Sequence, residues 1–453
     1  MKKNYLLGMA LIASLSFYSC DKEVVYVQDG NGVESVADGA QIITLQVENG
    51  GDGLATRAGR PLYSAEAKQT IENVKLWICD NTGKVVYITG KVVYIKGISD
   101  WNTDDVSTVY TTGGHGRQTT IELKGADKLA AGTYKIYAVG YSNSSAYTLT
   151  NVTNVTKESA FNENMVLPCS TAGEEIFAGQ MELTVEKGKG FKKPVVLNRQ
   201  VAGAFAYVKD IPFMEGAKYL KLVASAQNQS LVLGNFNSFD LTGNGSGNAN
   251  VKYVVNGTNG KSGSETYVIS TIDLNKWFTA IKDDNGDNLI DAGENWKNPC
   301  RPSSSPAAGT YPTFQKGSAF GGEFVIPFAH VDGKQTLTLQ LTNAGGKVLR
   351  SWKVNLGSTD EQLKQTITCW NSGSTDWSTS LSGELANTYS LVRNHLYGIG
   401  TRMNDEANPE KPGVDPDPNP ESPNDKPESL NNKQELVLKV NDNWEVIHGM
   451  ELD

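Results

Sequence analysis

Short stretches of alternating apolar and polar residues recur along most of the chain, and glycine, asparagine and other turn-forming residues separate them. The stretches are rich in β-branched and aromatic side chains, which are typical of strands. Strands of this length between frequent turns indicate antiparallel sheets rather than alternating strands and helices. We therefore predict an all-β chain: two tandem antiparallel β-sandwich domains of transthyretin-like or Greek-key type, few short helices and an extended C-terminal strand. The predicted strands of the body cover residues 40–49, 73–80, 84–90, 118–125, 133–141, 181–188, 193–200, 203–211, 217–225, 322–331, 335–342, 348–356 and 394–401.

Two regions of the size of a sandwich domain are separated by a break near Arg199, giving predicted domains at residues 58–198 and 199–402. The composition changes after Arg402, where residues 404–432 contain seven of the sixteen prolines and eight acidic residues. Such a segment buries too little apolar surface to offset its ordering entropy, so residues 403–433 are predicted to form an extended, solvated linker. In polyproline conformation it would span roughly 90 Å.

One helix is predicted, in the stretch from Ser270 to Asp284. Four apolar residues recur there at helical spacing, and Asp273 precedes them as a plausible N-cap. The four residues are Leu274, Trp277, Phe278 and Ile281.

The last segment, residues 434–453, alternates without a slip in phase. Such a period of two predicts a strand with one face built for a core. Asp442 and His448 are the polar members of that face. Its apolar members are Leu436, Leu438, Val440, Trp444, Val446, Met450 and Leu452.

A strand near the N-terminus is similar to this tail. The sequence from Thr44 to Asn49, TLQVEN, matches VLKVND at 437–442 in kind and phase. Chance similarity of two strands is one reading. The other is that both fit the same groove in turn: the first strand leaves, and the tail of another copy replaces it. Head-to-tail insertion is a heterologous contact and would propagate as a filament.

A glycine-rich loop at residues 50–60 follows the first strand and carries two arginines. A protease could cut this loop to release the strand. Proline restricts the residue before it and lacks an N–H group, so Arg60, which precedes Pro61, is the poorer of the two cleavage sites. We favour Arg57. The alternative is that both arginines only solubilise the loop.

The first twenty residues combine two lysines, a short apolar run and a cysteine at position 20. This is the pattern of a secretory signal, and the run is too short for a stable membrane-spanning helix. A cysteine after a small residue indicates a bacterial lipoprotein signal over residues 1–20, with lipidation of Cys20 by acyl chains such as palmitate. Ordinary secretion with a chance cysteine is the alternative. Residues 21–57 then form a pro-segment that includes the removable strand.

Together, these features resemble the fimbrillins of Bacteroidales, the major shaft subunits of type V pili, and among them the Mfa1-like and FimA-like proteins. The resemblance runs over the whole chain. It depends on the signal ending at Cys20, the strand before the arginine-bearing loop, the two sandwich-sized halves, the segment from Tyr389 to Gly400, and the terminal strand.

The resemblance implies a cell-surface fimbrium built from a lipid-anchored precursor at the outer membrane. An arginine-specific protease would remove the first strand, and C-terminal donor strands would link copies of the chain. The implied partners are other copies, accessory tip and anchor subunits, the protease, and host or bacterial surface ligands of unknown identity. Two alternatives remain: a non-polymerising tip or anchor adhesin, and a surface glycan-binding lipoprotein.

An acidic segment from Asp283 to Glu294 has the spacing of a calcium loop. Asn288 occupies the position usually held by glycine, and no second helix is predicted after the loop. The site would be structural, and an acidic surface turn is the alternative reading. The candidate ligands are Asp283, Asn285, Asp287, Leu289 through its carbonyl, Asp291 and Glu294.

The remaining chemistry excludes several classes. A net charge of −9 with no basic run argues against nucleic acid as a partner. Of the five cysteines, four besides Cys20 could form two disulfides or none; we expect Cys79 and Cys369 to be buried thiols. No catalytic motif occurs, so an enzyme is not expected. The four histidines, which we expect at the surface or at strand edges, are His115, His330, His395 and His448.

Overall fold

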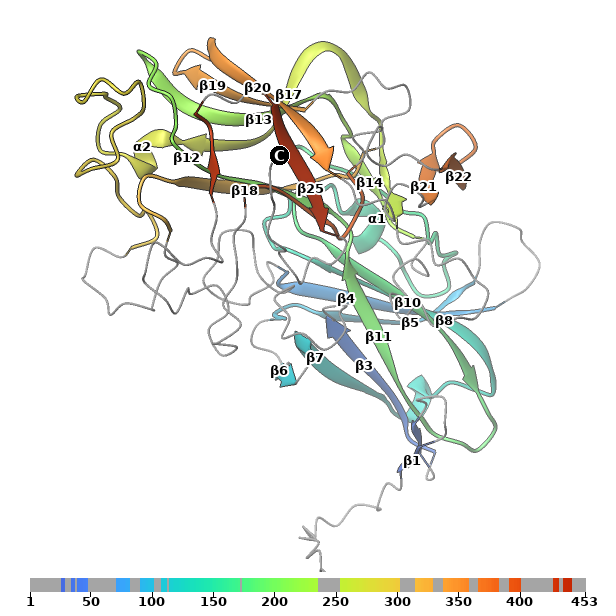
Figure 1. The fold of residues 1–453 in the computed structure, drawn as a ribbon. Coiled ribbons are helices and arrows are strands. Elements are labelled where there is room, and N and C mark those ends of the chain that lie inside the picture. The colour runs from blue at the N-terminus through green and yellow to red at the C-terminus, as the bar shows by residue number, and fades with distance from the viewer. Residues whose placement is uncertain are drawn as a thin grey trace, which may run out of the picture.

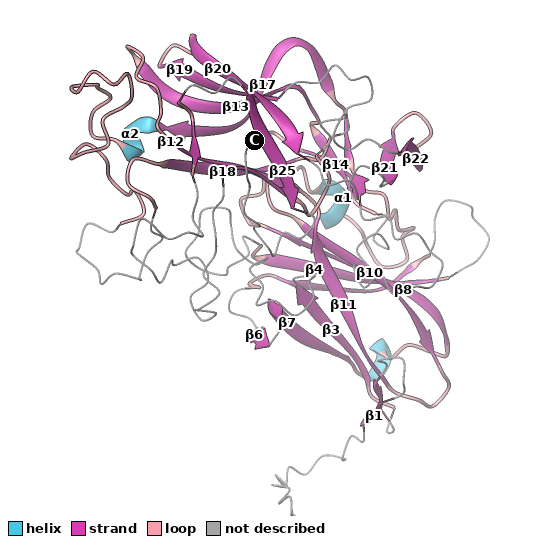
Figure 2. Cartoon of the chain, in the orientation of Figure 1, coloured by secondary structure: helices cyan, strands magenta, loops and turns pink. Residues whose placement is uncertain are grey.

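A computed structural model gives the fold. It describes residues 26–28, 34–36, 39–47, 71–81, 90–101, 107–111, 114–171, 173–234, 253–301, 314–328, 337–357, 366–382, 391–400, 427–431 and 435–441. Over these residues the regular secondary structure is almost entirely strand, which confirms the predicted all-β class (Figure 2). No helix among them is long and apolar enough to cross a membrane.

The first large sheet contains most of the strands up to residue 199, in the order β5-β4-β8-β10-β11-β3-β7-β6 (Figure 1). Two three-residue strands near the N-terminus, β1 (Tyr26–Gln28) and β2 (Glu34–Val36), lie off this path. The other bounds are β3 (Gln41–Val47), β4 (Asn73–Asp80), β5 (Val92–Ile98), β6 (Ser107–Thr111), β7 (Gly114–Leu123), β8 (Gly132–Tyr141), β10 (Phe177–Val185) and β11 (Phe191–Arg199).

This sheet folds over on itself at the contact of β10 with β11. Only two residue pairs join these strands, Phe177 with Arg199 and Ala178 with Asn198. A Cβ atom on Gly179 would lie 1.8 Å from the carbonyl oxygen of Val196, so the close crossing requires glycine there. The two halves enclose one apolar core, which includes Leu76 and Ile136. The result is a sandwich.

The second large sheet has the order β17-β13-β19-β20-β25-β23-β12-β18, with the short β24 beside β12. Its core contains five large aromatic side chains that are almost fully buried: Tyr207, Trp277, Phe278, Trp352 and Tyr397. The bounds are β12 (Ala202–Lys209), β13 (Ala217–Gln227), β17 (Lys261–Asp273), β18 (Ala319–Val325), β19 (Leu337–Asn343), β20 (Val348–Gly357), β23 (Leu396–Ile399), β24 (Glu428–Ser429) and β25 (Glu435–Asn441).

The sheets are mixed rather than purely antiparallel. Most ladders run antiparallel as predicted, whereas β3 with β11, β12 with β23 and with β24, β20 with β25, and β15 with β21 are parallel. Parallel neighbours cannot be joined by a tight hairpin and must arrive from distant parts of the chain. A local alternation of apolar residues carries no information about such partners.

Two small sheets connect and flank the sandwiches. In one, β9 (Val166–Pro168) of the first region pairs with β14 (Ser230–Val232), and β14 pairs with β16 (Gly257–Thr258). The other contains β15 (Tyr253–Val255), β21 (Thr366–Asn371) and β22 (Asp376–Ser382). The predicted domain boundary at 198/199 lies at the end of β11, and the chain crosses this junction between Arg199 and Ala202.

Buried polar side chains occupy the junction. The Nε and Nη2 atoms of Arg199 donate to Oε1 of Glu175 at 2.8 and 2.6 Å, and both side chains are at most 1% exposed. Asn256 donates to the carbonyl oxygen of Gln200, and Arg393 donates to the side chain of Gln200 and to the carbonyl of Gly234. These bonds tie β11, the crossing and the second region together.

The predicted helix is much shorter than its pattern suggested. Only α2 (Leu274–Trp277) forms, with Asp273 as the N-cap that accepts from the amide of Asn275. Residues 270–273 belong instead to the long strand β17, whose ladder with β13 satisfies their backbone. Leu274, Trp277 and Phe278 are buried as expected. The remaining short helices are α1 (Thr150–Thr153) and the 3₁₀ turn η1 (Gly125–Asp127).

The end of the predicted linker is part of the folded body. Residues 427–431 lie against β12, where Val208 pairs with Glu428 and Lys209 with Ser429. Leu430 is fully buried in the second core, and its amide donates to the carbonyl of Lys209. The prediction of a solvated segment is wrong for residues 427–431, because pairing with β12 and burial of Leu430 together hold them against the second core.

Candidate strand-exchange site

β3 lies in the middle of the first sandwich, between β11 and β7 (Figure 1). It runs parallel to β11, from Gln41 beside Phe191 to Val47 beside Leu197. It runs antiparallel to β7, from Gln41 beside Leu123 to Gln46 beside Gln118. A strand near the N-terminus thus fills a central position that later parts of the chain enclose on both sides.

The inward side chains of β3 complete the core. Ile43 and Leu45 are both 0% exposed and belong to the same apolar cluster as Val195 and Leu197 of β11. Fully burying a side chain of this size contributes about 1.5–3 kcal/mol. Without β3, these two positions would be empty and the facing edges of β7 and β11 would lose their backbone partners.

The entry to this groove is held by polar contacts. Gln41 is 5% exposed. Its Nε2 donates to the carbonyl of Leu129 at 2.9 Å, and its Oε1 accepts from the amide of Leu129 at 2.7 Å. The amide of Phe191 donates to the carbonyl of Ala40, and Lys128 donates to the carbonyl of Gly39. Gln41 is two residues before Ile43 and four before Leu45, so it lies on the same inward face of the strand. This spacing is the sequence signal from which its burial could have been predicted.

The first half of the C-terminal tail lies within the second sandwich of its own chain. β25 runs parallel to β20, with Leu436 beside Val354 and Leu438 beside Leu356. On its other side it runs antiparallel to β23, with Val440 beside Tyr397. The tail was predicted to pair with another copy; in this structure residues 435–441 pair within the chain. Trp444, Val446, Met450 and Leu452 lie outside the described residues.

The two strands that the sequence singled out as similar, β3 and β25, hold similar positions. Each lies inside a sheet, parallel to one neighbour and antiparallel to the other. Each belongs to a segment far in sequence from at least one of those neighbours. The predicted processing residues Cys20, Arg57 and Arg60 lie outside the described residues, and so do residues 48–70 as a whole.

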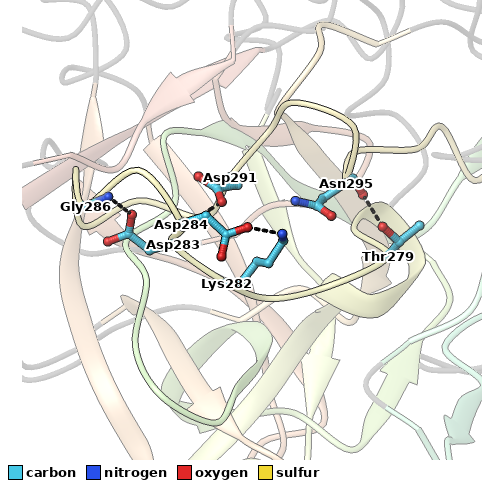
Figure 3. A network of polar contacts seen from close by, with 7 residues as sticks. All are labelled: Thr279, Lys282, Asp283, Asp284, Gly286, Asp291 and Asn295. Atoms are coloured by element: carbon cyan, nitrogen blue, oxygen red, sulfur yellow. Dashed lines mark hydrogen bonds and ion pairs between the residues drawn. The ribbon is translucent and has the colours of Figure 1, made fainter.

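The acidic loop at 283–294 is closed by its own backbone (Figure 3). The Asp283 carboxylate accepts from the amides of Gly286 and Asn288. Asn288, at the position usually held by glycine, has a left-handed conformation with φ of 63°. Asp291 accepts from the amide of Asp284, whose carboxylate pairs with Lys282. Leu289 forms a bridge with Pro212, which attaches the loop to the second sandwich.

These carboxylate oxygens accept backbone hydrogen bonds and keep further lone pairs. Within the described part of the chain, no group of three or more His, Cys, Asp or Glu side chains is placed to hold a metal ion. Asp283, Asn285, Asp287, Leu289, Asp291 and Glu294 form an ordered turn, with Asn285 accepting from the amide of Asp287 and Asp287 from that of Leu289. Calcium binding at this loop stays a prediction.

Histidine and cysteine side chains correct two expectations. His395 was expected at the surface or at a strand edge, but it is 3% exposed, and its Nδ1 lies 2.8 Å from the carbonyl of Arg393. It lies just before β23, where the chain enters the core. Cys79, Cys169, Cys300 and Cys369 are free thiols; Cys79 is buried as expected, whereas Cys369 is only partly buried. Burial raises the pKa of Cys79 to about 12 and that of Cys369 to about 11, so both remain protonated near neutral pH.

Two tryptophans meet on the hairpin of β21 and β22. Trp370 and Trp377 are directly opposite in the ladder, with ring centroids 5.2 Å apart and planes at 69°. The indole N–H of Trp377 donates to Asn164 of the first region at 3.0 Å. Stacking on a sugar ring needs a flat exposed face, whereas this edge-to-face pair fastens the hairpin to the body.

Comparisons with known proteins are faint. No family model matches the chain, and no curated protein is similar to it in sequence. Solved structures with some likeness include a fimbrial assembly protein from Parabacteroides distasonis, with 12% identity, TM-score 0.36 and coverage of 80% of this chain and 92% of that one.

Two others come from Porphyromonas gingivalis. The tip fimbrial protein Mfa3 has 11% identity and a TM-score of 0.35, covering 80% of this chain and 95% of that one. The fimbrial anchor protein Mfa2 has 12% identity and a TM-score of 0.30, covering 69% and 81%. At these TM-scores the likenesses carry neither fold nor function over to this chain, and the strands themselves have to support any proposal.

Proposed function

We propose that the chain is a structural subunit of a surface fimbria. It is exported as a lipoprotein precursor acylated at Cys20, cut by an arginine-specific protease at Arg57, and polymerised by exchange of strands between copies. Its partners are other copies of itself, accessory tip and anchor subunits, and the protease, and the filament contributes to adhesion. It has no catalytic role.

The position of β3 is the observation that supports this most. A strand that ends at Val47, shortly before an arginine-bearing loop, fills the centre of a sheet and two core positions. If cleavage released it, the facing edges of β7 and β11 would expose unpaired N–H and C=O groups, each costly when buried. The opened sandwich would therefore bind a replacement strand of the same alternation.

The tail offers that alternation. Its residues Leu436 and Leu438 correspond to Ile43 and Leu45 of the removed strand. A tail that enters from the same end and runs parallel to β11 would restore both ladders and refill both core positions. Because donor and acceptor surfaces are on different parts of the chain, the contact repeats without closing and gives a filament.

The pairing of β25 within its own chain adds a step to this scheme. The tail must leave the second sandwich before it can enter another copy. Over the described residues, β25 pairs with five residues of β20 and three of β23. β3 pairs with seven residues of β11 and six of β7. The vacated first groove therefore offers longer ladders than the second, which favours transfer once β3 has gone.

The test is to cut purified full-length protein with an arginine-specific protease and follow SDS-resistant ladders on gels. We expect ladders from the parent, none from an Arg57→Ala, Arg60→Ala double variant, and none from a chain that ends at Arg402. Edman sequencing of the product identifies the cut and separates Arg57 from Arg60. A parent protein that stays monomeric after complete cleavage would rule out the shaft proposal.

The same experiment separates the alternatives. A tip or anchor subunit would be cut, or would resist the protease, without forming ladders from itself alone. A glycan-binding lipoprotein would form no ladders and would bind to glycan arrays. Labelling cells with palmitate and comparing the parent with Cys20→Ala tests the lipid anchor independently of assembly.

A further inference from the structure

The apolar positions of the groove between β7 and β11 do not by themselves fix the register of an incoming strand. A donor strand with strict alternation can slide by two residues and still direct apolar side chains inward. If Leu438 takes the place of Leu45, then Leu436 takes that of Ile43. Moved by two residues, Leu438 would occupy the Ile43 position and Val440 the Leu45 position. Both core positions stay apolar in either case, so hydrophobic burial hardly distinguishes the two registers.

The structure contains a contact that does distinguish them. At the groove entry, Gln41 joins both backbone groups of Leu129, with distances of 2.9 Å to the carbonyl and 2.7 Å from the amide. A primary amide is the side-chain group that can donate to a carbonyl and accept from an N–H of the same residue. Gln41 is nearly fully buried, so an unsuitable side chain at this position would leave the amide and carbonyl of Leu129 with neither that side chain nor water as a hydrogen-bond partner.

The tail has a glutamine at the corresponding position. Gln41 is four residues before Leu45, and Gln434 is four residues before Leu438. We propose that the backbone of Leu129 is a register-setting site for the incoming tail of a second copy, and that Gln434 is the residue that it recognises. This inference rests on the proposed strand exchange and specifies its geometry.

Neighbouring registers lose the contact. A slip that puts Leu436 at the entry sets an apolar side chain against the amide and carbonyl of Leu129. The opposite slip puts Asn432 there, which is one methylene shorter, and moves Gln434 to the fully buried position of Ile43. Only one register satisfies both the entry and the core.

The register predicts which residues become neighbours across copies. With Gln434 at the entry, Lys439 takes the place of Gln46, opposite Gln118 of β7. In a slip by two residues, Asn441 is opposite Gln118 instead. Within its own chain Lys439 lies beside Gly357 and Gly398 of the second sandwich, so a link from residue 439 to residue 118 reports exchange.

The experiment compares two double variants of the full-length chain, Gln118→Cys with Lys439→Cys and Gln118→Cys with Asn441→Cys. Each is cut with the arginine-specific protease, assembled, and treated with a short bis-maleimide. Mass spectrometry then measures the yield of each linked pair. We expect the 118–439 link to dominate in the background that retains Gln434.

Adding Gln434→Ala should lower the ratio of the 118–439 to the 118–441 link by about tenfold or more, because the correct register then loses two hydrogen bonds to Leu129. Gln434→Glu should do the same, because a carboxylate cannot donate to the carbonyl of Leu129. The matched control is Glu435→Ala, in the opposite phase, which should leave the ratio unchanged. All three changes are in the tail, outside the sandwich that is being filled.

The outcomes separate the two proposals. If Gln434→Ala still forms SDS-resistant ladders and its ratio of the 118–439 to the 118–441 link is unchanged, Gln434 does not set the register. The same follows if the 118–441 link dominates in the chain that retains Gln434. Strand exchange itself would stand in both cases. The absence of both ladders and any link between copies overturns the proposed function and this inference with it.

Discussion

The grooves that hold β3 and β25 are alike in geometry and different in what closes them. Both place a strand between a parallel and an antiparallel neighbour. The first groove is closed by an N-terminal strand whose inward residues are fully buried and whose entry is fixed by Gln41 and Leu129. The second is closed by the tail, which follows the anchored Leu430. The difference teaches that strands of similar pattern can be held in unlike ways; under the proposed exchange, β3 would be the strand that leaves and β25 the strand that is donated.

We expect the junction between the two sandwiches to couple their stability, and its buried ion pair to be the contact most sensitive to substitution. Glu175→Ala leaves Arg199 charged and buried, which should lower the free energy of unfolding by about 3–5 kcal/mol. Urea denaturation followed by tryptophan fluorescence measures the change. The control Glu182→Ala, which removes an exposed carboxylate paired with Lys135, should change stability by less than about 1 kcal/mol.

Because the junction ties both sandwiches together, we expect one cooperative transition in the parent and two separated transitions in Glu175→Ala. A single transition of unchanged midpoint in the variant would show that the ion pair does not couple the two regions.

A second comparison concerns β3 alone. Leu45→Ala should destabilise the uncut chain by about 2–5 kcal/mol, because it empties a fully buried position. The same variant should assemble normally after cleavage, because the changed strand has left. Val348→Ala, at a side chain that is 45% exposed, is the control and should have little effect in either state. Equal destabilisation of cut and uncut forms would mean that β3 stays in place.

The acidic loop tests the second region separately. Asp283→Ala removes the acceptor of two backbone amides, Gly286 and Asn288, and should cost about 1–3 kcal/mol without any cation. Asp284→Ala, which removes only an exposed pairing with Lys282, should cost less than about 1 kcal/mol.

The same variants address calcium. We expect calcium to raise the melting temperature of the parent and to leave those of Asp283→Ala and Glu294→Ala unchanged, measured by calorimetry in chelator and in calcium. Identical heats of calcium titration for the parent and both variants would end the calcium prediction.

The smallest expected effect is an alkaline one in the first sandwich. Burial raises the pKa of Cys79 from 9.0 to about 12. Between these values the unfolded chain releases the thiol proton and the folded chain keeps it, so the free energy of unfolding falls as pH rises through this window. The contribution is fully present below pH 9.

At pH 10 the loss should be about 1 kcal/mol. Denaturation curves at pH 8 and pH 10 measure it, and Cys79→Ala should lose less stability between the two than the parent does. Cys169→Ala, at a half-buried thiol, is the control and should follow the parent. A parent and a Cys79→Ala variant with the same pH dependence would contradict the buried, protonated thiol.

Much of the fold could be predicted from local pattern. Strands such as β4, β8 and β13 were predicted because they are short runs rich in β-branched and aromatic residues between turn-forming residues, and such composition is a local property. The helix was predicted too long because the chain becomes extended at Phe278, which forms a bridge with Trp296. Such tertiary pairing outweighs helical spacing over a few residues.

The candidate site was predicted only in part. The likeness of the first strand to the tail was evident from Leu45, Val47, Leu438 and Val440. The partners were not, because β11 and β7 are some 70 to 150 residues away along the chain from β3, and pairing over such distances leaves no local trace. Leu430 and His395 were misplaced for the same reason: burial depends on which surfaces the fold brings against them.

The sequence by itself determined which segments can be strands and which face of each is apolar, since these depend on residues two apart. It also determined that two distant segments share one pattern. Only the tertiary structure decided what each strand lies between, that β25 pairs within its own chain, and that the buried amide of Gln41 binds Leu129. Those outcomes depend on backbone groups and core space contributed by segments far apart in the chain, and no short stretch of residues specifies them.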